Sequence, residues 1–124
     1  MKLFTIDQAN ELLPVVRRHL VAIQDLYLRL KPMVSHARCA ASANMAGGGM
    51  PGGSDYVRTL YEIGRVTTEL DELGVQLKDH TRGLVDFPCL SNDRIILLCW
   101  QFDDGDSIEW WHEEEAGFAG RQRL

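Results

Sequence analysis

The residues best suited to chemistry lie together in the last third of the chain. His112 follows two adjacent tryptophans and precedes three glutamates in the run Trp110–Glu115, and the remaining tryptophan, Trp100, lies ten residues before this run. Rigid aromatic area beside titratable groups is typical of binding sites, and it is equally typical of the core of a small protein. The pattern therefore indicates a candidate site and leaves its chemistry open.

Metal binding is the first chemistry to consider. In an extended strand, His112 and Glu114 would point to the same side about 7 Å apart, close enough for two ligands of one ion. A catalytic zinc needs a third protein ligand, for which Asp86 is the natural candidate. A two-residue turn at Asn92-Asp93 would place Asp86 opposite Cys99 and roughly 12 Å from His112. Because of that distance we do not expect a metal ion, and His112 and Glu114 remain weak candidate ligands. We expect no other cofactor either.

Acid–base catalysis is the second chemistry. With a two-residue turn at Asp104-Gly105, strand alternation puts Glu109 on one face with Trp100 and Trp111, and puts His112 on the other face. Desolvation among the indoles would favour the protonated Glu109 carboxyl and suit it to general acid–base work. The alternative is a solvated glutamate at the sheet edge, with its stem packed on tryptophan.

Asp86 is a third candidate because its neighbours are apolar. The rest of the run Leu84–Pro88 consists of Leu, Val, Phe and Pro, and a buried aspartate needs a partner. Arg82, Arg121 or Lys78 could supply that partner. Such an ion pair would lock the C-terminal tail to the sheet, whereas in an enzyme Arg82 or Arg121 would recognise a substrate anion.

Two helices are predicted to support these residues. Residues 5–43 carry apolar side chains at alternating steps of three and four, beginning with a capping box at Thr5–Gln8. Pro14 predicts a kink or break in this first helix. A second helix of the same periodicity is predicted at 54–73, and the glycine-rich segment 44–53 between them is typical of a flexible loop. We expect the two helices to form an antiparallel hairpin.

A small sheet should follow the hairpin. Residues 75–113 show the alternation of an antiparallel meander of three or four strands, with 114–124 as a tail. The strand Ile95–Trp100 is apolar on both faces, so both faces must be covered. The helices cover one face, and we expect a second subunit or a ligand on the other. The sequence thus predicts an α+β fold in one domain over 1–124, assembled as a homodimer.

The composition excludes several classes of protein. No run approaches the ~18 apolar residues of a membrane span, and the chain does not open as a signal peptide does. Three scattered cysteines favour a reducing cytoplasm over a disulfide framework. Residues 1–66 hold eight basic and five acidic residues, and residues 67–124 hold five and thirteen. An acidic half would repel a phosphate backbone, so we expect no nucleic acid as partner, and without an apolar span we expect no membrane.

Several motifs resemble those of a known family. They lie at Gly74–Asp79, Arg82–Pro88, Leu98–Trp100, Trp111–Glu113 and Gly117–Arg121, with a similar opening at Phe4–Pro14. Together they resemble a bacterial family catalogued as domain of unknown function 2203. The resemblance implies a small cytoplasmic bacterial protein with no established activity. It adds weight to the residues on motif positions, namely Asp86, Trp100, Trp111, His112 and Arg121.

Two hypotheses for the function follow. The first is a non-enzymatic, homo-oligomeric binding or assembly module, which would use the aromatic-acidic sheet face and the helical stripe as contact surfaces. The alternative is a small-molecule or metal-dependent enzyme that uses Asp86, Glu109 and His112.

Overall fold

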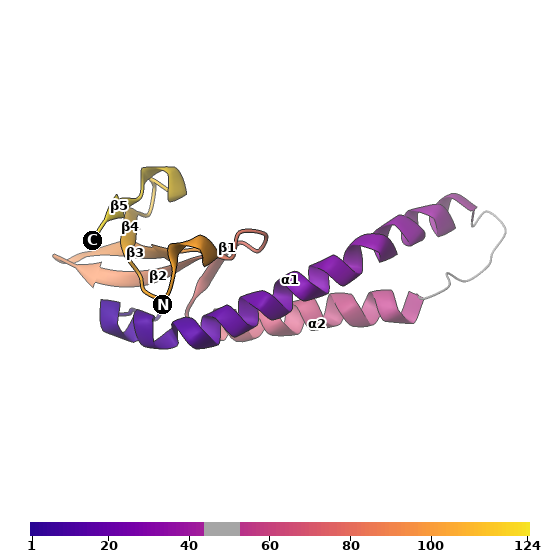
Figure 1. The fold of residues 1–124 in the computed structure, drawn as a ribbon, viewed down its shortest axis with the longest axis horizontal. Helices are drawn as coiled ribbons and strands as arrows, with labels where there is room; N and C mark the ends of the chain where they lie inside the picture. Colours follow the sequence, from indigo (N-terminus) through magenta and orange to yellow (C-terminus); the bar gives the residue numbers. More distant parts are fainter. Residues whose placement is uncertain (44–52) are drawn as a thin grey trace.

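The computed structural model describes the backbone of residues 1–43 and 53–124, and the side chains of residues 1–35 and 53–124. The predicted loop at 44–53 lies outside the described residues except for Gly53, which begins the second helix. The helices are α1 (Ile6–Ala43) and α2 (Gly53–Glu72). The strands are β1 (Gln76–Asp79), β2 (Leu84–Ser91), β3 (Arg94–Trp100), β4 (Trp110–Glu113) and β5 (Gln122–Arg123). This confirms the α+β fold with a helical hairpin (Figure 1).

Helix α1 begins with the predicted capping box. The Thr5 hydroxyl accepts a hydrogen bond from the Gln8 amide at 3.1 Å, and the Gln8 side chain accepts one from the Thr5 amide at 3.0 Å. The helix continues through Pro14 without a break. A proline inside a helix costs roughly 3 kcal/mol, and burial of Leu13 and Val16 on either side of it offsets that cost. The kink at Pro14 stays a prediction.

The sheet has five antiparallel strands in the order β1-β2-β3-β4-β5. The expectation of three or four strands was therefore wrong. The additional strand comes from the segment that we treated as a tail, because Gln122 and Arg123 pair with β4. This segment has too few apolar residues to be recognised by alternation, so its pairing depends on the edge that β4 offers.

The register between the central strands is the predicted one. The β2–β3 turn has positive φ at both Asn92 (49°) and Asp93 (64°), as a two-residue type I′ turn requires, and it sets Asp86 opposite Cys99. The β3–β4 connection is different, because Phe102–Asp104 forms a 3₁₀ turn in place of the predicted two-residue turn. The pairing of Cys99 with Trp110 is nevertheless as expected.

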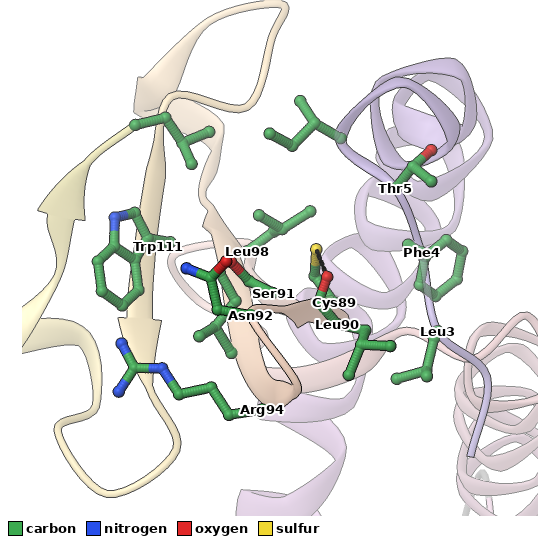
Figure 2. A pocket seen from close by; sticks show the side chains of 13 residues that line it. Leu3, Phe4, Thr5, Cys89, Leu90, Ser91, Asn92, Arg94, Leu98 and Trp111 are labelled. Atoms are coloured by element: carbon green, nitrogen blue, oxygen red, sulfur yellow. Dashed lines mark hydrogen bonds between the residues drawn. The ribbon is translucent and has the colours of Figure 1, made fainter.

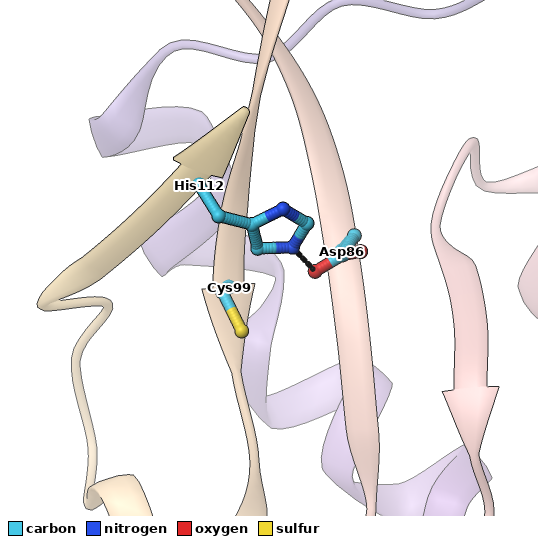
Figure 3. Close-up of side chains that lie close together, drawn as sticks. All are labelled: Asp86, Cys99 and His112. Atoms are coloured by element: carbon cyan, nitrogen blue, oxygen red, sulfur yellow. Dashed lines mark hydrogen bonds and ion pairs between the residues drawn. The ribbon is translucent and has the colours of Figure 1, made fainter. Parts of the chain in front are cut away.

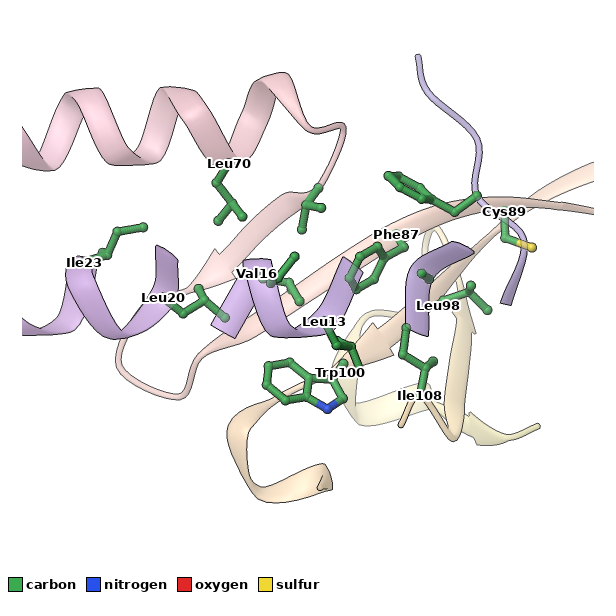
Figure 4. Packing of buried hydrophobic residues seen from close by; sticks show 14 of the residues in the cluster. Leu13, Val16, Leu20, Ile23, Leu70, Phe87, Cys89, Leu98, Trp100 and Ile108 are labelled. Carbon is green, nitrogen blue, oxygen red and sulfur yellow. The ribbon is translucent and has the colours of Figure 1, made fainter. Parts of the chain in front are cut away.

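The helical hairpin lies on one side of the sheet, and the C-terminal segment lies near β4 and β5 on the side away from the hairpin (Figure 1). The helical hairpin packs on one face, which we call the inner face, and a continuous apolar core lies between them. Trp100 is fully buried there, and its Nε1–H donates to the Gly105 carbonyl at 3.0 Å. Side chains from α1, α2, β2 and β3 meet in this core (Figure 4), among them Leu13, Val16, Leu20, Ile23, Leu70, Phe87, Leu98 and Trp100.

Part of the opposite, outer face is covered by the chain itself. Leu97 and Cys99 on β3 are buried, and Phe118 of the C-terminal segment borders the same space as Leu97. Gly117, at a φ of 65°, allows the backbone to turn back over the sheet. Leu97 and Cys99 therefore need no second subunit or ligand to cover them, whereas Ile95 on the same face is 39% exposed, and the homodimer stays a prediction. In the described part of the chain, neither helix has the length and apolar character needed to cross a membrane.

Candidate functional site on the outer face of the sheet

Three neighbouring strands bring three chemically reactive side chains to one point of the outer face. Asp86 lies on β2 opposite Cys99 on β3, and His112 on β4 lies opposite Leu97, which precedes Cys99 by two residues. Alternation puts all three on the same face, and each is buried. Figure 3 shows the imidazole of His112 directed at the carboxylate of Asp86, with the thiol of Cys99 beside them.

The distances are much shorter than the sequence suggested. His112 Nε2 lies 3.0 Å from Asp86 Oδ1, and one ligand atom from each of Asp86, Cys99 and His112 lies within 4.8 Å of the other two. The separation of roughly 12 Å predicted from strand spacing was therefore wrong as a measure of contact. The estimate of roughly 12 Å was a distance between backbone positions. The side chains of Asp86 and His112 extend toward each other across β3, where the small side chain of Cys99 leaves room for them.

Both ring nitrogens of His112 have oxygen partners. Nδ1 lies 2.7 Å from the backbone carbonyl oxygen of Glu113, which can only accept, so Nδ1 carries a hydrogen. Nε2 contacts Asp86. Neither nitrogen is hydrogen-bonded to the thiol of Cys99, as the base of a cysteine nucleophile would be. Burial, together with the charge of Asp86, raises the pKa of Cys99 to about 11, so the thiol is protonated at neutral pH.

A small cavity adjoins this cluster. Its volume is about 180 Å³, and Asp86, His112 and Phe118 form part of its lining. Lys78 and Glu114 also line it and are exposed, so the cavity reaches the protein surface. Glu114, which we paired with His112 as a weak metal candidate, lies at this edge and outside the three-residue cluster.

Arg82 and Arg121 contact residues of the C-terminal segment and not Asp86. Arg121 pairs with both carboxylate oxygens of Asp104, at 2.6 and 3.1 Å, and its guanidinium lies 4.4 Å from the ring centroids of Trp110 and Phe118. Arg82 lies over the Phe118 ring at 4.0 Å. The prediction that an arginine or lysine pairs with Asp86 was wrong, because His112 takes that place. An ion pair does fix the tail to the rest of the fold, but Asp104 supplies its carboxylate.

A larger groove lies on the inner side, at the start of α1. We call it the N-terminal groove; its volume is about 750 Å³ (Figure 2). Its lining combines the N-terminal segment, strands β2 to β4 and the end of the chain: Leu3, Phe4, Thr5, Ile6, Cys89, Leu90, Ser91, Asn92, Arg94, Ile96, Leu98, Trp111 and Leu124. The Phe4 amide donates to the Pro88 carbonyl at 2.7 Å and so holds the N-terminal segment against β2.

A family model described as Uncharacterized conserved protein (DUF2203) matches residues 2–124. The chain belongs to this family. The resemblance drawn from the motifs is thereby confirmed over nearly the whole chain, whereas the bacterial origin stays a prediction. Comparison with curated proteins gave no match, and neither did comparison with solved structures.

The structure divides the candidate residues of this DUF2203 protein among several places. Asp86 and His112 meet on the outer face, while Trp100 belongs to the core and Trp111 lines the N-terminal groove. Glu109 is partly exposed and pairs with Arg123 at 3.4 Å. The three residues predicted for an enzyme therefore do not all converge.

Two features were missed in the sequence. Cys99 belongs to the outer cluster, and its predicted position opposite Asp86 was a signal that could have placed it there. The N-terminal groove could not be foreseen, because its lining includes Leu3 and Ile6, which precede or begin the first helix, and Leu124 at the far end of the sequence. No local pattern connects these segments.

Proposed function

We propose that this DUF2203 protein is a non-enzymatic assembly module that forms a homodimer through the N-terminal groove. One observation carries the proposal: the groove combines buried apolar side chains with exposed ones from segments far apart in the sequence. Leu3, Ile6, Leu90 and Leu124 are between 40% and 57% exposed. Contiguous apolar surface on a protein usually marks a contact site.

The lining favours a protein surface over a small charged molecule. The only charged side chain in the lining is that of Arg94, and its guanidinium lies 2.7 Å from the Glu113 carboxylate. A small-molecule site of this volume usually buries most of its ligand. Here the exposed leucines would instead leave a ligand open to water, whereas another protein surface would cover them.

A second copy of the chain is the occupant that this geometry suits. A two-fold interface uses the same patch on both subunits, so the patch must supply both the projecting groups and the space that receives them. Leu90 and Leu124 project at the rim of the groove. In such a dimer they would insert into the groove of the partner.

The neighbourhood of Cys99 supports a role without catalysis. Its raised pKa and the engagement of both ring nitrogens of His112 with oxygen atoms argue against a nucleophilic cysteine. Cys89 and Cys99 are free thiols, which supports a reducing compartment such as the cytoplasm. The proposal also includes that the protein binds neither nucleic acid nor a membrane.

Sedimentation velocity tests the dimer directly. We expect the unmodified protein to sediment as a dimer at micromolar concentration, and Leu90→Glu to shift it to the monomer because it places a charge in the apolar interface. Val21→Glu is the matched control, because Val21 on α1 is similarly exposed at 53% and lies outside the groove. A monomeric unmodified protein would contradict the proposal, and so would dissociation by both variants alike.

A further inference from the structure

We propose that Asp86, Cys99 and His112 form a binding site for a divalent transition-metal ion of the zinc class. The site lies on the outer face of the sheet, whereas the N-terminal groove lies on the inner side. The metal site can therefore be tested independently of the proposed dimer. Three observations carry the inference: the hydrogen positions around His112, the set of ligand atoms, and the cavity beside them.

The first observation concerns His112. Its Nδ1–H is held by the Glu113 carbonyl at 2.7 Å, so the lone pair of a neutral imidazole is on Nε2 and points toward Asp86 Oδ1 at 3.0 Å. A lone pair and a carboxylate oxygen repel each other, so a positive centre must lie between them. That centre is either a proton or a metal ion. Histidines that bind metals usually have this arrangement, with the second ring nitrogen donating to a carbonyl or carboxylate.

The second observation is the combination of ligands. A thiolate, an imidazole and a carboxylate together favour zinc over calcium or magnesium, which prefer oxygen ligands alone. In a tetrahedral zinc site with bonds of about 2.0–2.3 Å, the ligand atoms lie about 3.4–3.7 Å apart. Here the three atoms lie within 4.8 Å of one another without an ion. Small side-chain rotations would close the remaining difference, because the three ligand atoms already lie this close together.

The third observation is the space next to the cluster. The cavity of about 180 Å³ is lined by Asp86 and His112 and is large enough to hold water molecules. Three protein ligands and a fourth position open to a cavity are the pattern of zinc sites that keep a water molecule or bind a further ligand. Glu114 at the edge of the cavity would then accept a hydrogen bond from such a water molecule without contacting the ion.

The charges and protons balance for a divalent ion. Binding releases the proton of the Cys99 thiol and the proton between His112 and Asp86 to the solvent, which leaves a thiolate, a carboxylate and a neutral imidazole on the ion. The positive charge of Arg121 does not oppose this, because Asp104 neutralises it through two hydrogen bonds.

Titration of the chelator-treated, full-length protein with Zn²⁺ alone tests the site. We expect one ion per chain. With Co²⁺ as the probe, we expect a thiolate-to-cobalt charge-transfer band in the near ultraviolet, which reports a bond to sulfur. Cys99→Ser should abolish the band. It should also weaken Zn²⁺ binding by more than the ~10–100-fold that follows loss of a hydrogen-bonding partner of a metal ligand.

Two control variants locate the ion. Cys89→Ser changes a buried cysteine of the inner face that lies outside the cluster and should leave stoichiometry, affinity and band unchanged. Cys39→Ser should also leave them unchanged. The proposal is overturned if less than about one ion in ten chains binds, if the band persists in Cys99→Ser, or if either control removes it. A raised melting temperature with Zn²⁺ in the unmodified protein, and none in Cys99→Ser, would confirm that the folded site is the one occupied.

Discussion

The two faces of the sheet are buried in different ways. On the inner face, two helices cover a continuous layer of apolar side chains, and Trp100 makes a hydrogen bond to the Gly105 carbonyl there. On the outer face, a short C-terminal segment covers a cluster in which Asp86, Cys99 and His112 are in close contact. The inner face depends on the apolar area that is removed from water, and the outer face on the geometry of a few polar contacts. The same sheet therefore combines a core stabilised by close apolar packing with a cluster stabilised by a few polar contacts.

The largest effect should come from truncation on the inner face. Trp100→Ala removes a fully buried indole and its hydrogen bond to the Gly105 carbonyl, and we expect a loss of about 3–5 kcal/mol in the free energy of unfolding. Urea denaturation monitored by circular dichroism measures it. A loss below about 1 kcal/mol would show that burial of Trp100 on the inner face contributes little to the free energy of unfolding.

Next in size is removal of one polar partner on the outer face. His112→Leu leaves the buried Asp86 carboxylate without its partner, and we expect a loss of about 3 kcal/mol. Adding Asp86→Leu should recover part of that loss, because two apolar groups need no partner. A double variant whose loss equals the sum of the two single losses would mean that the pair contributes no coupling.

A smaller effect is expected where the C-terminal segment is fixed. Arg121→Ala breaks the two hydrogen bonds to Asp104 and the contacts with two aromatic rings. We expect a loss of about 1–3 kcal/mol, because the carboxylate of Asp104 is left largely buried. The exposed pair of Arg123 and Glu109 is the control, and Arg123→Ala should cost below about 1 kcal/mol. If Arg121→Ala and Arg123→Ala lowered the free energy of unfolding equally, the contacts of Arg121 would not fix the C-terminal segment more firmly than an exposed ion pair does.

The smallest difference concerns the two buried thiols. Burial raises the pKa of both, but the charge of Asp86 adds to the effect at Cys99, whose pKa is about 11. At pH 8 only about one Cys99 in a thousand would be a thiolate, and this fraction grows as the pH rises toward 11. Alkylation at pH 8 of the Leu90→Glu variant, whose N-terminal groove should be free of a partner, followed by peptide mapping should therefore modify Cys89 in that groove faster than Cys99. The opposite order would show that the outer face opens more readily than the inner one.

The sequence was sufficient for the parts of the fold that depend on local pattern. The apolar period located both helices, Thr5 and Gln8 located the start of the first, and the Asn92-Asp93 turn set the register of β2 and β3. These features depend on residues that are close together in the sequence, so a short segment is enough to predict each of them.

The remaining features depend on segments that meet only in the folded chain. Strand β5 pairs because β4 offers an edge, and the contact between Asp86 and His112 needs side chains to reach across β3. Spacing along and between strands gives the positions of backbones and not of carboxylate or imidazole groups. This is why the outer cluster was dismissed on distance, although the register that creates it was predicted correctly.

The C-terminal cover has a consequence for how the protein is made. A ribosome releases the helices and the central strands first, and Gly117 and Phe118, which border the same space as Leu97, follow later. Until then the nascent chain exposes an apolar sheet face and an unpaired β4 edge, which are the features that cause aggregation of incomplete chains. Folding of this protein should therefore finish only after synthesis of Arg123, and chains that stall shortly before it should be substrates for chaperones and proteases.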